Sequence, residues 1–336
     1  MSQAMHIAKN KKNLLIRSQI IRLIREFFWS QDFTEVETPL IVKYPGQEPN
    51  LTPMSVEIEN ERGQKYFGYL HTSPEYTMKK MLSAGFGNIF SICKCFRNQE
   101  SFGGLHNPEF TMVEWYQIHA NMFDVMDMFD ELIKNLVKKL SASNLKFEIF
   151  NFQKIERVYM RNLWQKILGV DLDDYLTREK MYELCVEKKY HVEKDASYEE
   201  LFYRIFLDEI EPKLKGKNII IHHYPAQMAA LSKLSLDDPR YAKRFEVYID
   251  GVEIANAFSE LNNSEEQLKR LQDEQMKRKK IGKDVYDIDM EFIEAVGKMP
   301  KCAGIALGVD RLVQVFGDCN EIDDVLTLPM SKLFIE

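Results

Sequence analysis

Hydrophobic residues recur at helical spacing near the start of the chain. Over residues 13–29 they fall on one face, and basic residues occupy the opposite face. This pattern predicts an amphipathic helix that ends where the polar run Ser30-Gln31-Asp32 begins. The next segment, 33–38, is predicted to be extended, and Pro39 closes it because proline has no amide proton for a sheet. The apolar face of the helix comprises Leu14, Ile20, Ile21, Ile24, Phe27 and Phe28.

The same periodicities predict a mixture of strands and helices along the rest of the chain. Strands are expected at 66–70, 88–96, 108–119, 217–223 and 243–258, and helices at 74–84, 122–140, 264–280 and 288–297. Long connections separate the strands, without the regular alternation of a parallel sheet. We therefore expect an α+β fold. A polar, helical stretch at 141–215 is predicted to be an insertion into a single catalytic domain that covers residues 1–336.

Composition and charge exclude only a few classes of protein. The chain has 336 residues and a net charge of −7, which argues mildly against a protein that grips a nucleic-acid backbone. Its five cysteines include no CxxC pair; Cys93 and Cys95 lie on one face of a predicted strand and are interpreted as reduced core thiols, not as metal ligands. With no secretory or membrane-spanning apolar run, a cytoplasmic protein is expected.

A first candidate site lies between two predicted strands at residues 96–116. The segment reads FRNQESFGGLHNPEFTMVEWY, which predicts a hairpin with a glycine-containing loop. Arg97 can bind a phosphate oxygen through its planar guanidinium, and His106 can meet a more distal phosphate. Phe110 offers a ring on which a purine can stack. Each residue alone would fit a plain surface hairpin equally well.

A second candidate site contains two glutamates seven positions apart. Residues 244–261 read RFEVYIDGVEIANAFSEL, and the Asp-Gly pair is a hairpin turn signal that would place Glu246 and Glu253 across from each other. Facing carboxylates repel unless a cation lies between them, and Mg²⁺ is the natural choice; an exposed acidic hairpin is the alternative. Glu260 follows an apolar pair, so we expect it to face a pocket and need a cationic partner.

A third candidate site is the segment AGIALGVDRLV at residues 303–313. Small residues alternate at Gly304, Ala306 and Gly308, which lets another group approach the strand closely. Arg311 then lies in the first turn of a predicted helix, where the helix dipole adds to its attraction for an anion. A buried strand–helix junction without a ligand would use small residues as well.

Taken together, these segments resemble the ordered motifs of class II aminoacyl-tRNA synthetases. FTEVETP at 33–39 resembles motif 1, residues 96–116 resemble motif 2, and GIALGVDRL at 304–312 resembles motif 3. TSPEYTMKKML, HNPEFTMVEWY and ANAFSEL resemble the lysyl branch in particular. The resemblance covers residues 13–330 and implies the class II catalytic fold, an antiparallel sheet flanked by helices.

The length before motif 1 points to one group within that branch. Lysyl-tRNA synthetases have an N-terminal domain that reads the anticodon, and we expect no such domain here because the motif 1 helix begins at residue 13. The chain is therefore most similar to the elongation factor P lysine ligase family. That family activates (R)-β-lysine with ATP and transfers it to a lysine side chain of elongation factor P. The resemblance implies ATP and Mg²⁺, elongation factor P as acceptor in place of tRNA, no membrane, and a homodimer through motif 1.

The resemblance also implies a role for each matched residue. Arg97 would hold the α-phosphate and the substrate carboxylate, and Arg311 would bind the γ-phosphate end, as the two catalytic residues. ATP-binding residues would be Arg97, Gln99, His106, Asn107, Phe110, Glu246 and Arg311, and the magnesium pair Glu246 and Glu253. Substrate-binding residues would be Glu75 and Glu114 for one amine, Glu260 with Tyr116 for the distal ammonium, Asn256 for the carboxylate, and Ala306.

Several positions depart from the pattern of relatives. Gln99 stands where motif 2 has glutamate, and its carbonyl can still accept a hydrogen bond from adenine. Leu105 replaces an arginine of many relatives, and Ala257 replaces a common glycine. Ala306 matches the ligase family, whereas lysyl-tRNA synthetases have glycine there. One added methyl group near the α-carbon should disfavour an α-amino group by roughly 10–200-fold.

Three other functions remain open from the sequence. A truncated lysyl-tRNA synthetase would activate L-lysine for tRNA or another acceptor. A non-catalytic regulator of this family would bind without reacting, but the motif arginines and carboxylates are all present. An amide-forming relative with an acidic substrate is disfavoured, because Glu75 and Glu260 would repel it.

Overall fold

A computed structural model describes residues 2–142 and 155–334 of the chain. Part of the predicted insertion, residues 143–154, lies outside the described residues. The chain separates into two compact units, Met1–Phe150 with Leu261–Glu336, and Asn151–Glu260. None of the helices within 2–142 and 155–334 combines the length and apolar character needed to span a lipid bilayer.

The first unit begins with the predicted amphipathic helix. Helix α1 (Gln3–Lys9) precedes α2 (Lys11–Ser30), which ends at the predicted residue. Leu14 and Ile21 are only half-buried, because the apolar stripe is slightly rotated from the predicted one. The buried face consists of Ile16, Ile20, Leu23, Ile24, Phe27 and Phe28.

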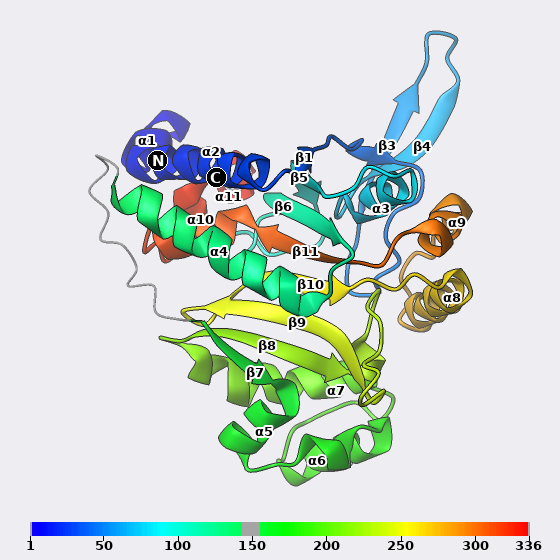
Figure 1. The fold of residues 1–336 in the computed structure, drawn as a ribbon. Coiled ribbons are helices and arrows are strands. Elements are labelled where there is room, and N and C mark those ends of the chain that lie inside the picture. The colour runs from blue at the N-terminus through cyan, green and yellow to red at the C-terminus, as the bar shows by residue number, and fades with distance from the viewer. Residues whose placement is uncertain (1, 143–154, 335–336) are drawn as a thin grey trace. The chain divides into compact units, whose positions relative to one another are not determined.

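The strands of the first unit carry motifs 2 and 3. They follow the order β1 (Thr34–Glu35), β5 (Ile89–Phe96), β6 (Glu109–Ile118) and β11 (Cys302–Gly308). β1 is parallel to β5, whereas β6 is antiparallel to both of its neighbours. Helices α2, α4 (Met122–Ser141) and α10 (Val309–Phe316) pack on one another, with α4 against β11 and α10 against β6 (Figure 1). The predicted strands and helices of this region are confirmed, including a mostly antiparallel pattern.

A smaller sheet and several helices complete the first unit. Strands β2 (Ile41–Val42), β4 (Lys65–Leu70) and β3 (Met54–Glu59) form an antiparallel sheet, and β3 and β4 extend as a long hairpin (Figure 1). β4 was predicted from the sequence but β3 was not, because its residues are mostly exposed and therefore lack a clear apolar face. The helices are α3 (Glu75–Ser83), α8 (Ser264–Lys280), α9 (Met290–Lys298), α11 (Met330–Leu333) and the 3₁₀ turn η5 (Ile322–Val325).

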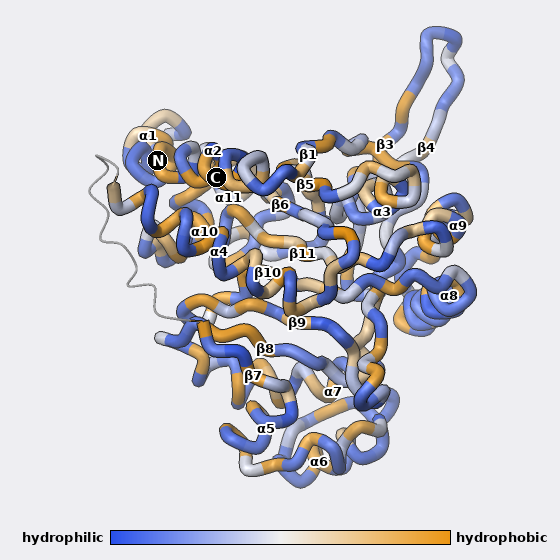
Figure 2. The backbone as a smooth tube through the Cα atoms, viewed as in Figure 1, coloured by the Kyte–Doolittle hydropathy of each residue, from blue (hydrophilic) through white to orange (hydrophobic). Residues whose placement is uncertain are grey.

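The second unit is a four-stranded sheet covered by helices. Its strands follow the order β10 (Val252–Ser259), β9 (Tyr241–Ile249), β8 (Asn218–Pro225) and β7 (Glu156–Tyr159). Figure 2 shows that hydrophobic and hydrophilic stretches both occur along β8 and β9. Helices α5 (Met160–Leu168), α6 (Arg178–Glu187) and α7 (Tyr198–Ile205) contribute Trp164, Leu184 and Phe202 to a core shared with Ile221.

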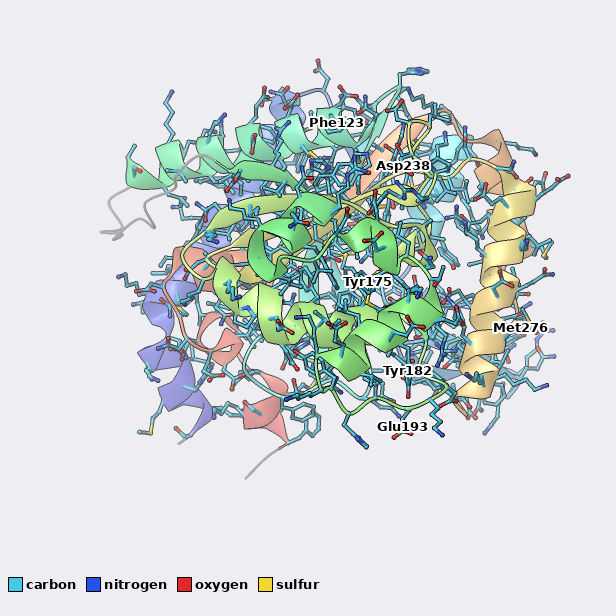
Figure 3. The ribbon with its side chains drawn as sticks, turned by 90° about the horizontal axis from the view of Figure 1, so that it is seen from below. Phe123, Tyr175, Tyr182, Glu193, Asp238 and Met276 are labelled. Atoms are coloured by element: carbon cyan, nitrogen blue, oxygen red, sulfur yellow. The ribbon has the colours of Figure 1, made fainter. Side chains whose placement is uncertain are left out.

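Short helical turns connect the elements of the second unit. They are η1 (Leu172–Tyr175), η2 (Phe206–Ile210), η3 (Glu211–Leu214) and η4 (Ala226–Met228). Figure 3 views the helical side of this unit, where Tyr175 of η1, Tyr182 of α6 and Glu193 are labelled. β7 was not predicted, because the whole stretch 141–215 has a helical pattern.

The predicted turn between the two glutamates is confirmed. Asp250 and Gly251 have φ angles of 51° and 79°, and they join β9 and β10 in an antiparallel hairpin. A side chain at Gly251 would place its Cβ 3.0 Å from the backbone nitrogen of Lys215. Glycine is therefore required there both for the positive φ and for the close approach.

Candidate active site

The alternating small residues of β11 lie beside two predicted substrate residues. In the registers of β5, β6 and β11, Ser91, Glu114 and Ala306 form one row. Tyr116 and Gly304 occupy the next row on the same face, since residues two apart in a strand share a face. The methyl group of Ala306 therefore stands directly opposite Glu114 on the neighbouring strand.

Glu114 is a buried carboxyl group held by two hydroxyls. Its side chain is 2% exposed, Ser73 Oγ donates to Oε2 at 2.8 Å, and Tyr116 donates to Oε1. Burial raises the pKa of Glu114 well above its ordinary value, and the negative charge of Glu75 raises it further. Tyr116, which the sequence placed at the distal ammonium, thus contacts the carboxyl group assigned to the other amine.

Glu75 lies in the first turn of α3 and is partly neutralised. Lys79, which is fully buried, places Nζ 2.6 Å from Glu75 Oε1. The backbone nitrogen of Glu75 donates to Ser73 Oγ at 3.0 Å, so Ser73 connects Glu75 to Glu114. Neither Ser73 nor Lys79 was predicted as a site residue, although both belong to the quoted segment TSPEYTMKKML. The structure therefore brings Glu75, Glu114, Tyr116 and Ala306 into one part of the first unit.

Arg97 and Phe110 lie together at the end of the β5–β6 hairpin. The Arg97 Cζ atom is 4.9 Å from the centre of the Phe110 ring, in cation–π geometry. Arg97 Nε is buried, and none of the described residues accepts a hydrogen bond from it. A buried guanidinium donor normally has a partner, so this nitrogen fits a site for an anionic ligand.

His106 links the motif 2 loop to motif 3. Its Nδ1 lies 2.9 Å from Glu100 Oε2, and its Nε2 lies 3.5 Å from Arg311 Nη2. Arg311 Nε also donates to the carbonyl oxygen of Leu105 at 3.2 Å. The hydrogen bond from His106 lowers the pKa of Glu100, which is therefore a charged anchor for the loop. The two residues assigned to the distal phosphates are neighbours in the structure.

Asn107 and Gln99 have structural partners that the sequence did not indicate. Asn107 donates to the carbonyl oxygen of Glu109 at 2.5 Å, and its Oδ1 accepts from the Met330 backbone at 2.9 Å. Gln99 has a φ of 61°, and its Oε1 accepts from Thr52 Oγ1 at 3.1 Å. Asn107 thus holds the loop to the C-terminal segment. The side-chain carbonyl of Gln99, which we expected to recognise adenine, already accepts a hydrogen bond from Thr52.

Asp310, next to the predicted catalytic Arg311, is a buried anchor. It accepts a hydrogen bond from Arg17 of α2 and another from the Thr111 backbone, the latter at 2.7 Å. Arg17 also donates to Thr111 Oγ1 at 2.6 Å. This network fixes the first turn of α10 against β6, so that Arg311 is presented toward the motif 2 loop. Because Arg17, Thr111 and Asp310 lie far apart in the sequence, no local sequence pattern predicted these hydrogen bonds.

In the second unit, a β-bulge places three predicted residues on one face. Glu246 pairs with Asn256, and Glu253 pairs with Tyr248, with a register shift between Glu253 and Ala255. Because the shift adds one residue to β10, Asn256 and Glu253 face the same side as Glu246. The two glutamates are therefore diagonal neighbours on one face of the hairpin. We had expected them to be direct cross-strand partners, so the predicted register is wrong.

The carboxylate of Glu246 is saturated with hydrogen bonds. Oε1 accepts from Arg244 Nη2 at 2.6 Å and Tyr203 Oη at 3.4 Å, and Oε2 accepts from Tyr224 at 2.5 Å and Tyr248 at 2.8 Å. Burial raises the pKa of each tyrosine well above its ordinary value, so all three are neutral donors. A carboxylate has about four acceptor positions, and here all four are occupied. Glu246 as it lies does not fit a magnesium ligand.

Arg244, which was not predicted as a site residue, also orients Asn256. Its Nε donates to Asn256 Oδ1 at 3.1 Å, and Nη1 donates to the carbonyl oxygen of Met228 at 2.9 Å. With its oxygen bound to Arg244, the amide of Asn256 offers its NH₂ group to an acceptor such as a carboxylate. Arg244 could have been found from its position two residues before Glu246 on the same strand face. Glu260 is buried, and its backbone forms an isolated β-bridge with Ser232. Its predicted pocket and cationic partner stay a prediction.

The thiols of β5 form a cluster in the first unit. Cys93 and Cys95 lie on one strand face, with sulfurs 4.0 Å apart, and Cys95 Sγ is 4.0 Å from His71 Nε2. The hydrogen bond from Cys95 holds the pKa of Cys93 well below its ordinary value. Cys93 and Cys95 are unbridged, as predicted, and the other three cysteines are unbridged as well. The three side chains also come within 4.8 Å of one another, as metal ligands would.

Comparison with known proteins shows which family this chain belongs to. The model of the family described as tRNA synthetases class II (D, K and N) matches residues 3–332. A protein from Haemophilus influenzae (strain PittGG), named elongation factor P--(R)-beta-lysine ligase, is 35% identical over 324 residues, 96% of each chain. Proteins of the same name from Mannheimia succiniciproducens and Yersinia enterocolitica are 36% and 35% identical, over 96% and 95% of each chain.

Proposed function

Because the chain belongs to the class II tRNA synthetase family (D, K and N), we propose that it is an ATP-dependent ligase for elongation factor P. It activates (R)-β-lysine and transfers it to a lysine side chain of that factor. Near full-length relatives that carry this name support the proposal. The observation that carries it is the row of Glu114 and Ala306 beside Tyr116, with Glu75 joined through Ser73. Such a set of acidic groups suits a substrate with two amines.

The reaction needs no nucleophile from the enzyme. The carboxylate of the amino acid attacks the α-phosphorus of ATP, and pyrophosphate leaves. The acceptor ε-amine then attacks the carbonyl carbon of the adenylate, AMP leaves with the bonding electron pair, and the amine loses a proton. Arg97 holds the α-phosphate and Arg311 the distal phosphates, so positioning and charge neutralisation provide the catalysis. The unsatisfied Arg97 Nε supports this assignment.

Some of the remaining predicted residues are proposed to contact a ligand, and the others hold the residues that do so in place. Phe110 stacks on adenine, His106 and Gln99 complete the nucleotide site, and Asn107 shapes its loop. Asn256 binds the substrate carboxylate, and Glu260 takes the distal ammonium. For Mg²⁺, which neutralises phosphate charge in such reactions, Glu253 is the proposed ligand from this chain. Glu246 instead holds Arg244 and, through it, Asn256.

The proposed assembly is a homodimer through motif 1, residues 33–39, with elongation factor P as the acceptor. Sedimentation of the purified chain at micromolar concentration tests the dimer. A monomer at that concentration would contradict the dimer without affecting the proposed chemistry.

The experiment for the function measures ATP–pyrophosphate exchange with (R)-β-lysine and L-lysine side by side. We expect exchange with both and a clear preference for the β isomer. Incubation with elongation factor P should then add the mass of one lysyl residue to a single lysine, detected by mass spectrometry of peptides. Preference for L-lysine with no protein transfer would favour a synthetase-like enzyme with another acceptor. Binding of ATP without any exchange would favour a regulator.

A further inference from the structure

A glutamate to which the sequence motifs assign no role lies at the substrate pocket of the first unit. We infer that Glu48 forms, together with Glu75, the subsite that binds the substrate ammonium group nearer the reacting carboxylate. The inference rests on the proposed function, because it assumes that the substrate is a diamino acid. It adds a specificity-determining residue from the segment between β2 and β3.

The pocket itself is built from two stretches of chain. It opens to solvent and lies between the segment after β2 and the start of α3. Glu48 lines it from the first stretch, and Ser73, Glu75 and Tyr76 line it from the second. Glu75 and Ser73 belong to the cluster that contains Glu114. The pocket therefore leads to the carboxyl groups assigned to amine recognition.

Glu48 presents a buried oxygen that has no partner of its own. Its Oε2 atom is inaccessible to solvent, and it accepts no hydrogen bond from any of residues 2–142 or 155–334. Buried carboxylate oxygens are normally paired, because removing them from water is costly. An unpaired oxygen on a residue that lines an open pocket is the arrangement expected when the missing donor is a ligand.

The local backbone is fitted to this carboxylate. A Cβ at Gly46 would overlap Glu48 Oε2, closer than any non-bonded contact permits. Glycine at position 46 therefore leaves room for the Glu48 carboxylate in its observed position.

The surrounding charges identify the ligand as a cation. Burial raises the pKa of Glu48, and the negative charge of Glu75 adds to the effect. Glu75 has a counter-ion in Lys79, at 2.6 Å. The positive charge of Arg97 partly offsets the rise in the pKa of Glu48, but no lysine or arginine in the described chain forms an ion pair with Glu48. An ammonium group would provide the N–H donors that Glu48 Oε2 lacks.

The position of Glu75 identifies which ammonium group binds there. The resemblance assigns Glu75 to the amine other than the distal one, and Glu48 lines the same pocket. An ammonium group between them would contact both carboxylates. Selection between α- and β-amino acids then depends on Glu48 as well as on the methyl group of Ala306.

The test compares Glu48→Gln and Glu48→Asp with wild type in ATP–pyrophosphate exchange. We expect Glu48→Gln to raise the KM for (R)-β-lysine by about 10-fold or more, because a charged hydrogen-bond partner is lost, with the KM for ATP within about twofold. Glu48→Asp keeps the charge and should recover part of the loss. The inhibition constant of 6-aminohexanoic acid, which lacks the inner amine, should stay unchanged. Glu59→Gln, at an exposed position of β3, serves as the matched control.

A readout of stability separates ligand binding from a structural role. Removing an unpaired buried charge should leave the Tm of Glu48→Gln equal to that of wild type or higher. An unchanged KM for the amino acid, or equal changes for 6-aminohexanoic acid and (R)-β-lysine, would overturn the inference alone. If Glu48→Gln does not fold, the group is structural and the inference is overturned. Wild-type enzyme that exchanges with neither lysine isomer would overturn the proposed function and the inference together.

Discussion

Arg244 and Glu246 form a buried ion pair, and both side chains make further hydrogen bonds to neighbouring residues. Arg244 Nη2 lies 2.6 Å from Glu246 Oε1, and the side chains are 11% and 4% exposed. The pair stands at the centre of a network of three tyrosines, Met228 and Asn256. Substitution of either residue should therefore lower the stability of the fold and change the orientation of Asn256. We expect these effects to be larger than any effect on metal binding.

The first prediction contrasts Glu246 with Glu253, the two glutamates that were assigned to magnesium from the sequence. Glu246→Gln leaves Arg244 buried without a counter-ion, so we expect a loss of about 3–5 kcal/mol in the free energy of unfolding, measured by urea denaturation. Glu253→Gln should leave stability within about 0.5 kcal/mol, because its side chain is partly exposed. It should raise the Mg²⁺ concentration needed for half-maximal exchange. Equal stability of the two variants would contradict the assignment.

The second prediction concerns the methyl group of Ala306. Ala306→Gly removes it from the position opposite Glu114, so the variant should accept L-lysine better relative to (R)-β-lysine. The ratio of the two kcat/KM values should move toward L-lysine by about 10-fold, within the range for one methyl group in a pocket. Cys302→Ala, at the start of the same strand, is the control. If the ratio is unchanged, Ala306 does not select the isomer.

The third prediction is a pH dependence from Glu114. Its pKa is raised by burial, so the folded state binds this proton more tightly than the unfolded state, whose glutamate titrates at about 4.3. The stabilising contribution is present at low pH and is lost as the pH rises through the folded pKa. Glu114→Gln should therefore gain Tm relative to wild type as the pH increases from 5 to 8, while exchange activity falls. A Tm difference independent of pH would contradict the raised pKa.

The fourth prediction concerns the thiol of Cys93. Because its pKa lies well below the ordinary value of about 8.5, Cys93 should be largely thiolate at pH 7. Iodoacetamide should modify it first, and the rate should reach half its plateau well below pH 8.5. Peptide mass spectrometry of wild type and Cys93→Ser measures the site and the rate. Cys185, which is buried and has a pKa raised to about 11, provides the internal control.

Local patterns predicted most elements that position the site. The helix α2, the β5–β6 hairpin and the Asp250-Gly251 turn follow from periodicity and turn chemistry, which act over short stretches of chain. The long exposed strand β3 was missed because neither of its faces is fully buried. Propensity alone does not identify such a strand, since its partner β4 provides the hydrogen bonds.

The site itself was predicted in its residue types but not in its connections. Glu114, Glu75 and Tyr116 came from the resemblance of short motifs to the family, whereas the Arg17–Asp310 contact joins residues far apart in sequence. Glu246 illustrates the limit most clearly. A sequence shows the carboxylate, but only the fold shows that Arg244 and three tyrosines use all of its acceptor positions.

The adjacency of Asp310 and Arg311 limits how this chain can vary in length. Asp310 is fixed to Arg17 and Thr111, and Arg311 reaches Leu105 and His106 in the opposite direction. One residue inserted after Gly308 would turn the following helix by about 100°, and both side chains would miss their partners. An insertion or deletion at the start of α10 would therefore break both sets of contacts at once, whereas a substitution at either position would break only one of them.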